Sequence, residues 1–292
     1  GTQTTNMNTY PFWVPDYDRV KDHTQDYPEV REIFRFPTAY WYGQRSGKPI
    51  KNLSKRLNRL FDRAGECLPV LVVYNLPNRD MGHYSKGGGK SRSDYLDFIE
   101  EFADGIGDRK PIVIYEPDGL PHTLNMSAKE AENRIDTMAS GAYLLAHKSK
   151  ARVYIDVGHS NWLEPEQAGK LLNYFNVDRI PGFSVNVSNY RSTQESMAWA
   201  ERVAEYTERR HFVIDTSRNG NGPYGNQWCN PPGRSLGHPP TTDTKHPLCD
   251  ALLWVKIPGE SDGYCNGGPR AGRFWPEYAS ELVQNTEWIK DQ

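Results

Sequence analysis

The sequence has few cysteines, no excess of either charge and no long apolar stretch. Four Cys are present among 292 residues, and 35 Lys and Arg stand against 37 Asp and Glu, which gives a formal net charge of −2. Proteins that bind nucleic acid or anionic membranes carry a basic patch, and this balance argues against both. No apolar run approaches the roughly 20 residues of a spanning helix. We therefore expect neither a nucleic-acid partner nor a membrane.

Export signals, linkers, repeats and low-complexity tracts are also not visible. The first ten residues, GTQTTNMNTY, are not a signal peptide and resemble a processed end. Aromatic and loop-forming residues are instead abundant, with 8 Trp, 17 Tyr, 21 Pro and 25 Gly. Because disordered chains are depleted in aromatic residues, we expect an ordered fold.

Short apolar runs of strand length recur along the chain. Most are nearly continuous, which is typical of strands buried on both faces. The predicted strands cover residues 38–42, 70–74, 112–115, 153–157, 183–187, 212–214 and 252–257. Helical patterns lie between them: Ser127 with Glu130 and Ser192 with Glu195 form capping boxes, and residues 53–60 and 95–102 are amphipathic.

This alternation of strand and helix predicts an α/β fold with a parallel sheet. We expect a single catalytic domain over residues 1–292, built as one distorted, TIM-like (β/α) barrel of about seven strands that is closed or nearly closed. Residues 1–9 are expected to form a loosely ordered extension. Residues 216–248, rich in Gly, Pro, Asn and Thr, depart from the alternation, and we expect an ordered, pinned and functional loop there.

Polar residues follow six of the predicted strands. They are Asn78, Arg79 and Asp80; Glu116 and Asp118; Asp156 and His159; Asn189; Asp215; and Lys256, Glu260 and Asp262. The carboxyl ends of parallel barrel strands share one face, so these groups should converge there. A single Asp in such a place is usually a helix cap or a turn former. The repetition over six strands favours a polar site for acid–base chemistry.

Three kinds of site suit such a face. Paired carboxylates cleave glycosidic bonds, His and Asp groups bind a hydrolytic metal, and an aromatic-lined mouth can simply bind sugar. No two His have close ligand spacing, so no metal and no cofactor is expected. Trp41, Trp162 and Trp228 fall at strand ends or in loops, where an indole stacks on the CH face of a sugar. Trp199 and Trp254 fall within predicted elements and are expected in the core.

Seven motifs together resemble the catalytic domain of glycoside hydrolase family 6 cellulases, over about residues 41–262. The motifs are YNLPNRD (74–80), YEPD (115–118), DVGHSNW (156–162), NVSNY (186–190), DTSRNGNG (215–222), WC (228–229) and KIPGESDG (256–263). The resemblance implies a distorted α/β barrel that hydrolyses β-1,4-glucan with inversion at the anomeric carbon.

The resemblance also implies roles. Asp118 matches the general acid, which the neighbouring carboxylate of Asp80 would keep protonated. Asp262 matches a proposed general base, and the alternative is a water that relays its proton toward Asp80. Tyr74 matches the tyrosine beneath the distorted sugar ring, and Ser85, shifted by one position, is nearest to the serine that binds the attacking water. The matches to substrate-binding positions are Trp41, Arg79, His159, Trp162, Asn186, Asn189, Trp228, Lys256 and Glu260.

The cysteines differ partly from the family pattern. Met81 stands where the family usually has a bridged Cys, so that disulfide is absent and the loop is expected to be more mobile. Cys229 and Cys265 match the family's second disulfide. Cys67 and Cys249 precede strands at the opposite face, and we expect two buried thiols there rather than a pair. A disulfide and an insoluble substrate together imply a secreted, extracellular protein.

Short segments favour an open cleft. Processive members enclose the site with long loops, whereas here a helix cap at Ser127 follows Asp118 within nine residues, and about 30 residues follow Asp262. We therefore expect endo-acting cleavage. The alternatives are an exo-acting cellobiohydrolase of the same family and a non-catalytic glucan-binding barrel. We expect a monomer whose partner is β-1,4-glucan (cellulose and cello-oligosaccharides), with a carbohydrate-binding module as a candidate attached module.

Overall fold

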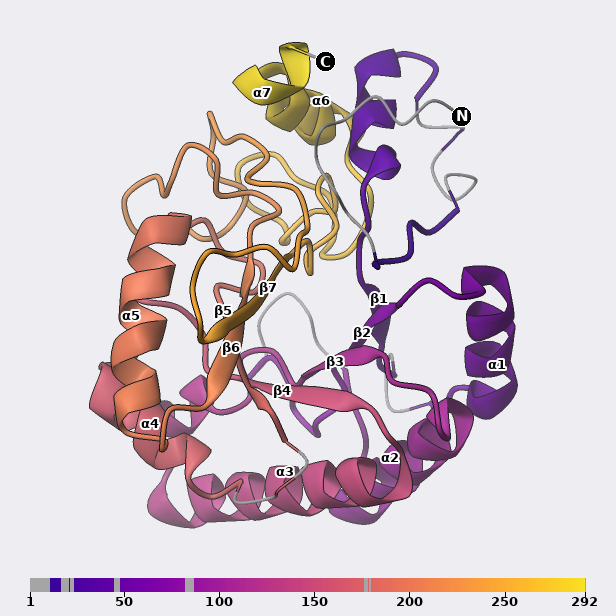
Figure 1. Ribbon diagram of the computed structural model, residues 1–292, viewed down its shortest axis with the longest axis vertical. Coiled ribbons are helices and arrows are strands. Elements are labelled where there is room, and N and C mark those ends of the chain that lie inside the picture. The colour runs from indigo at the N-terminus through magenta and orange to yellow at the C-terminus, as the bar shows by residue number, and fades with distance from the viewer. Residues whose placement is uncertain are drawn as a thin grey trace.

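Seven parallel strands form one sheet in which each strand pairs with the next along the chain. The computed structural model describes residues 11–16, 21, 24–44, 48–81, 87–175, 178 and 180–291. The strands are β1 (Tyr40–Tyr42), β2 (Val70–Val73), β3 (Ile112–Tyr115), β4 (Arg152–Asp156), β5 (Gly182–Val185), β6 (His211–Asp215) and β7 (Cys249–Leu253). The sheet curls into a distorted, TIM-like barrel (Figure 1), which confirms the predicted fold. The predicted extension at residues 1–9 lies outside the described residues.

Five helices cover the outer face of the curled sheet (Figure 1). They are α1 (Leu53–Ala64), α2 (Arg92–Ile106), α3 (Ala128–Lys148), α4 (Pro165–Leu172) and α5 (Thr193–Glu205). The predicted N-caps are confirmed, because Ser127 Oγ accepts from Glu130 N at 3.2 Å and Ser192 Oγ from Glu195 N at 3.1 Å. Across the part of the chain that the structure describes, no helix combines the length and the apolarity needed to cross a membrane.

Alternate side chains of each strand fill two different cores. Leu71 and Val73 of β2 pack outward against the helices, while Val70 and Val72 fill the barrel interior. Both sets are buried, so the strands read as continuous apolar runs, as predicted.

The barrel stays open along one seam. Among the described residues no strand ladder joins β7 to β1. The two edges are linked instead by Ala39 N, which donates to Trp254 O at 3.0 Å, and by Trp41 Nε1, which donates to Val255 O at 2.8 Å. The barrel is therefore nearly closed, with one side chain taking part in the closure.

A third apolar cluster lies beside the seam between β1 and β7 and was not predicted. It joins the 3₁₀ helix η3 (Pro28–Arg35) to α6 (Pro276–Gln284) and includes Trp254. In Figure 1 the indigo η3 lies beside the yellow α6, with α7 (Glu287–Lys290) following. Trp254 is 1% exposed and Trp199 is 7% exposed, which confirms both as core residues.

The boundaries of the last strand differ from the prediction. The ladder with β6 ends at Leu253, although the apolar run continues, because Trp254 and Val255 are buried without pairing to β6. Residues 216–248, which lead into β7, contain no helix or strand but are pinned to it, since Thr241 and Leu252 exchange backbone hydrogen bonds of 3.0 and 2.9 Å. The expectation of an ordered loop is confirmed.

Candidate active site

The carboxyl ends of the strands bring the predicted polar residues to one face. Tyr74 follows β2 directly, Asp118 lies three residues beyond β3, and Asp156 and Asp215 are the last residues of β4 and β6. Asp262 lies on the segment that follows β7. Because the strands are parallel and paired in order, all of these positions open on the same end of the barrel.

Asp118 lies against a second carboxyl group that is fully buried. Its backbone N–H donates to Asp156 Oδ2 at 2.8 Å. Asp156 also accepts from Gly158 N at 3.1 Å and from Ser184 Oγ at 2.8 Å. Burial, followed by the charges of Asp156 and Asp80, raises the pKa of Asp118 well above its usual value. An aspartic acid that keeps its proton is what a general acid requires.

Asp156 was noted in the sequence only as a residue that follows a strand. Burial raises the pKa of Asp156 to about 7. Its hydrogen bond to Asp118 joins residues 38 apart in the chain, and no local pattern reveals such a contact. The turn that carries Asp118 is left-handed, with φ of 65° at Asp118 and 51° at Glu116, so the segment after β3 holds an uncommon backbone conformation.

Tyr74 is partly exposed and is braced from the protein side. The Arg79 guanidinium lies 4.5 Å over its ring, and Nη1 of Arg79 donates to the backbone oxygens of Tyr74 and Gln44 at 2.9 and 3.0 Å. Trp41 approaches Tyr74 edge-on, with ring centroids 5.6 Å apart. Arg79 is only 9% exposed and supports Tyr74 through these contacts, while its role in substrate binding stays a prediction.

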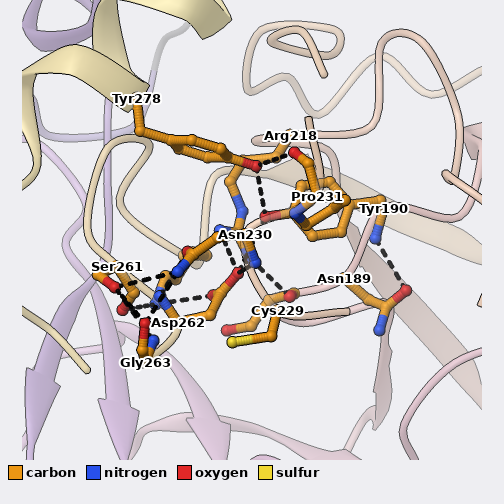
Figure 2. A network of polar contacts seen from close by, with 12 residues as sticks. Asn189, Tyr190, Arg218, Cys229, Asn230, Pro231, Ser261, Asp262, Gly263 and Tyr278 are labelled. Carbon is orange, nitrogen blue, oxygen red and sulfur yellow. Dashed lines mark hydrogen bonds and ion pairs between the residues drawn. The ribbon is translucent and has the colours of Figure 1, made fainter. Parts of the chain in front are cut away.

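Asp262 lies at the centre of a dense polar network (Figure 2). Its Oδ2 accepts from Arg218 Nη1, Tyr190 OH and Asn230 N, each at 3.0 Å. Its Oδ1 lies 3.0 Å from Arg218 Nη2 and 3.3 Å from Lys256 Nζ. Burial alone would raise the pKa of Asp262, but the charges of Arg218 and Lys256 outweigh it and hold the pKa below its usual value.

The network leaves Asp262 ionised and fully occupied. Five donor atoms lie within hydrogen-bonding or ion-pairing distance of the Asp262 carboxylate, which offers about four lone-pair sites. Arg218 is itself fully buried, donates to Ser188 O at 2.7 Å, and lies 4.3 Å over the Tyr190 ring. Sequence reasoning singled out Asp262 and Lys256 but not Arg218, because its contact to Asp262 spans 44 residues.

Asp215 and Asn186 are structural anchors beneath this face. Asp215 accepts four backbone N–H groups, those of Ser188, Ser217, Val255 and Lys256. Asn186 donates to Asp215 O at 2.9 Å and to Arg191 O at 3.1 Å, and it accepts from Arg191 N at 3.1 Å. Because Asn186 is 0% exposed, its prediction as a substrate contact is corrected to a role in holding the segment after β5.

The predicted sugar contacts after β4 form an aromatic group. Trp162 is partly exposed, with His159 at 5.6 Å and His122 at 5.2 Å between ring centroids. Burial and the charge of Arg191 lower the pKa of His159 to about 4, so this ring is neutral over most of the pH range. Asn189, Lys256 and Glu260 are also partly exposed at this end.

A disulfide joins the long loop to the segment after Asp262, as predicted. Cys229 and Cys265 are bonded, with Cα atoms 6.2 Å apart. Each follows an exposed aromatic side chain, since Trp228 is 47% and Tyr264 is 68% exposed. Trp228 was predicted from the sequence as a sugar contact and Tyr264 was not.

The remaining two cysteines are free thiols, as expected. Cys249 is buried, but Cys67 is exposed, so the expectation of two buried thiols is wrong for Cys67. Cys249 also begins β7 rather than preceding it. Ser85 lies outside the described residues, so the role proposed for it stays a prediction.

Replacing both Cys229 and Cys265 by alanine is expected to lower the free energy of unfolding by about 2–4 kcal/mol, since the bridge closes a loop 36 residues long in sequence separation. Urea denaturation followed by fluorescence measures the change. The exposed thiol variant Cys67→Ala is the control and should leave the midpoint unchanged. An unchanged midpoint in the double variant would show that the loop is held by its hydrogen bonds alone.

Comparisons with known proteins agree with this geometry. The model of the family "Glycosyl hydrolases family 6" matches residues 14–286. Endoglucanase A of Cellulomonas fimi is 42% identical over 264 residues, which cover 89% of this chain and 56% of that protein. Endoglucanase A of Thermobispora bispora is 40% identical over 264 residues, 88% of this chain and 57% of that protein. The chain thus spans a little over half the length of these two curated relatives.

A solved structure is similar over nearly the whole chain. The endoglucanase Cel6 of Mycobacterium tuberculosis, in complex with a thio-linked methyl-cellobiosyl cellobioside, superimposes with a TM-score of 0.88 at 38% identity. The match covers 94% of this chain and 97% of that one. The chain belongs to glycosyl hydrolase family 6.

Proposed function

We propose that the protein is an endo-acting β-1,4-glucanase, a cellulase that cleaves internal bonds of cellulose with inversion of the anomeric configuration. The observation that carries the proposal is Asp118: an aspartic acid with a raised pKa, at the strand-end face of a family 6 barrel. The two curated relatives above are both named endoglucanases, which supports the same activity.

In this proposal Asp118 donates its proton to the leaving oxygen. Burial keeps the proton in place, helped by the negative charge of Asp80 and, above its own pKa of about 7, by that of Asp156. Tyr74 lies beneath the sugar whose bond breaks.

Asp262 is less suited to take a proton from the attacking water. Its pKa is lowered and its oxygens already accept from five donors, so protonation would cost several hydrogen bonds. These contacts favour the alternative in which water relays the proton toward Asp80. Asp262 then orders Lys256 and the loop around Asn230.

Aromatic side chains are proposed to bind the glucan. Trp41, Trp162 and Trp228 are all at least partly exposed, as stacking on a sugar face requires. Of the polar positions, Arg79, Asn189, Lys256, Glu260 and His159 remain candidates for hydroxyl contacts. The cello-oligosaccharide analogue bound by the Mycobacterium tuberculosis enzyme is of the substrate class proposed here.

Endo action rests on the short segment after Asp118. Only the 3₁₀ helix η4 (Pro121–Asn125) lies between it and α3, so this side of the face carries no long covering loop. A glucan chain can then bind along its middle. The disulfide supports an extracellular location, where such bonds persist.

Carboxymethylcellulose tests the proposal. Internal cleavage lowers the viscosity rapidly while few reducing ends form, and we expect this result. Release of soluble cellobiose without loss of viscosity would indicate an exo-acting enzyme. Binding to cellulose with no new reducing ends would indicate a binding barrel. The anomer first formed from cellohexaose, followed by NMR, reports inversion.

A further inference from the structure

Glu116 is a fully buried acid, two residues before Asp118, that the proposed chemistry does not use. Its side chain is 0% exposed. Its Oε1 accepts from the backbone N–H groups of Asn75 at 3.0 Å and Leu76 at 3.3 Å. These two residues begin the segment that leads from β2 to Asp80. One carboxyl group therefore ties the segment of Asp80 to the segment of Asp118.

The other oxygen of Glu116 begins a chain of hydroxyl groups. Oε2, which also accepts from Asn75 N at 3.1 Å, lies 2.8 Å from Tyr95 OH on α2. Tyr95 OH in turn lies 2.7 Å from Tyr115 OH on β3. Tyr115 OH lies 2.8 Å from the backbone oxygen of Met138 on α3. The three contacts of the hydroxyl groups are of hydrogen-bond length and lie in the buried interior.

The number of protons available to this row of hydroxyl groups decides whether Glu116 is ionised. Met138 O carries no proton, so the hydroxyl of Tyr115 must donate to it. The single proton of the Tyr95 hydroxyl can then serve either Tyr115 or Glu116 but not both, so two phenolic protons cannot fill the three contacts. If Glu116 were ionised, two oxygens would face each other at under 3 Å with no proton between them. A carboxylic acid at Glu116 supplies the missing proton.

Other groups around Glu116 are consistent with a neutral acid. Burial raises the pKa of Glu116 to about 7, although the backbone N–H groups of Asn75 and Leu76 and the charge of Arg134 lower it, as a proton donated by Tyr95 would also do. The charged and titratable groups that face it are Arg134 on α3, Tyr95 on α2, Tyr115 on β3 and Tyr74 after β2. Gly141 of α3 makes room for the chain, because a Cβ there would lie 2.4 Å from Tyr115 OH.

Further bonds extend the same connection. Asn75 exchanges two hydrogen bonds with Gln44 beyond β1, at 2.7 and 2.8 Å, and its backbone oxygen accepts from Gly89 N at 2.8 Å. Arg134 donates to Pro77 O and Asn78 O at 3.1 and 2.9 Å, on the segment of Asp80. The exits of β1, β2 and β3 are thus joined through buried polar groups.

We propose that Glu116 is a neutral carboxylic acid and a positioning residue, which holds Asp80 and Asp118 in register by bonding the exit of β2 and donating to Tyr95. This role rests on the proposed glycosidase function, whereas the protonation of Glu116 does not. Glu116 contacts neither substrate nor reacting atoms.

Substitution separates charge from hydrogen bonding. In Glu116→Gln the amide keeps one acceptor and one donor, so kcat on cellohexaose should stay within about threefold of wild type. Glu116→Ala orphans two N–H groups and breaks the chain. There kcat should fall by about 10- to 100-fold, with KM changed by less than about threefold, because the acids are displaced but the sugar platforms are not. Glu132→Gln, an exposed change on α3, is the control.

Two measurements on the unliganded protein need no activity. Infrared difference spectra of ¹³C-Glu-labelled protein at pH 5 should contain a protonated carboxyl band that Glu116→Gln loses. The contribution of Glu116 to thermal stability is complete below the ordinary pKa of Glu, about 4.5, and is lost as pH rises through about 7. This fall should be smaller in Glu116→Gln, and the part that persists belongs to the other acids with a raised pKa, Asp156, Asp118 and Asp215.

Each outcome of these experiments supports or overturns one part of the proposal. A Gln variant as impaired as the Ala variant, or no protonated band, would overturn the neutral acid. A fully active Ala variant would overturn the positioning role. If the Ala variant does not fold, Tyr95→Phe keeps the ring and removes the proton acceptor, so the carboxyl band should shift, and an unshifted band would contradict the chain. A wild type that hydrolyses no glucan would overturn the function and the positioning role, while the infrared and melting results still report on protonation.

Discussion

Replacing Asp118 by alanine is expected to lower kcat on cello-oligosaccharides by a factor of about 10²–10⁴, the usual contribution of a general acid. Binding to cellulose should be retained, because the indoles of Trp41, Trp162 and Trp228, which are at least partly exposed, are untouched. Hydrolysis by reducing-end assay and binding by depletion from solution give the two numbers. In the wild type, activity should also fall as pH rises through the raised pKa of Asp118, because the group must be protonated to donate.

The identity of the leaving group sharpens this test. A dinitrophenyl cellobioside leaves without protonation, so Asp118→Ala should lose much less activity on it than on cellohexaose. Asp97→Ala, an exposed change on α2, is the matched control and should behave as wild type. Equal losses on both substrates would mean that Asp118 acts on structure or binding, and unchanged activity would refute the mechanism.

Replacing Arg218 by methionine should destabilise the protein by about 3–5 kcal/mol, because it leaves the buried charge of Asp262 with one partner fewer. The Arg218 and Asp262 side chains are 0% and 5% exposed, so water cannot compensate. Lys256, whose side chain is 11% exposed, remains as the second cation but makes a longer contact of 3.3 Å. Urea denaturation measures the loss, and Arg202→Met on the exposed face of α5 is the control.

A double-variant cycle isolates the pair. Adding Asp262→Leu to Arg218→Met removes the unpaired charge, so the double variant should be more stable than the sum of the two single changes predicts. Arg218→Lys should not restore stability fully, since a single ammonium cannot reproduce the two-pronged contact. Strictly additive losses would show that Arg218 stabilises through packing on Tyr190 and not through charge.

Local sequence patterns predicted much of the fold. The capping boxes at Ser127 and Ser192 located α3 and α5, since a cap depends on residues three positions apart. The helices α4, α6 and α7 were missed because they are short, and because α4 packs against α5 and α6 against η3, contacts that the local sequence does not show. The end of β7 was misplaced because burial and strand pairing give the same apolar signal.

The site was only partly visible for a related reason. Residue type and position after a strand singled out Asp118 and Asp262 as candidates. The same two criteria also select polar residues that are buried and only hold the backbone in place. Asn186 is such a case, bonded to backbone that the sequence does not place nearby. Conversely, the importance of Asp156, Glu116 and Arg218 lies in contacts 38 to 44 residues away along the chain. Spacing within a motif carries no information on such contacts.

The open seam between β1 and β7 has a consequence for how ligands affect the fold. The described hydrogen bonds across the seam are one backbone bond and that of the Trp41 indole, so even with Phe36 packed on Trp254 the seam should open at a lower free-energy cost than the paired strands. Trp41 also presents part of its surface to solvent at the strand-end face. A glucan packed on that surface would restrict the motion of the Trp41 indole, whose hydrogen bond helps to close the seam. Amide hydrogen exchange at Ala39 would then slow in proportion to ligand occupancy, so the least stable edge of the barrel reports on whether the cleft is filled.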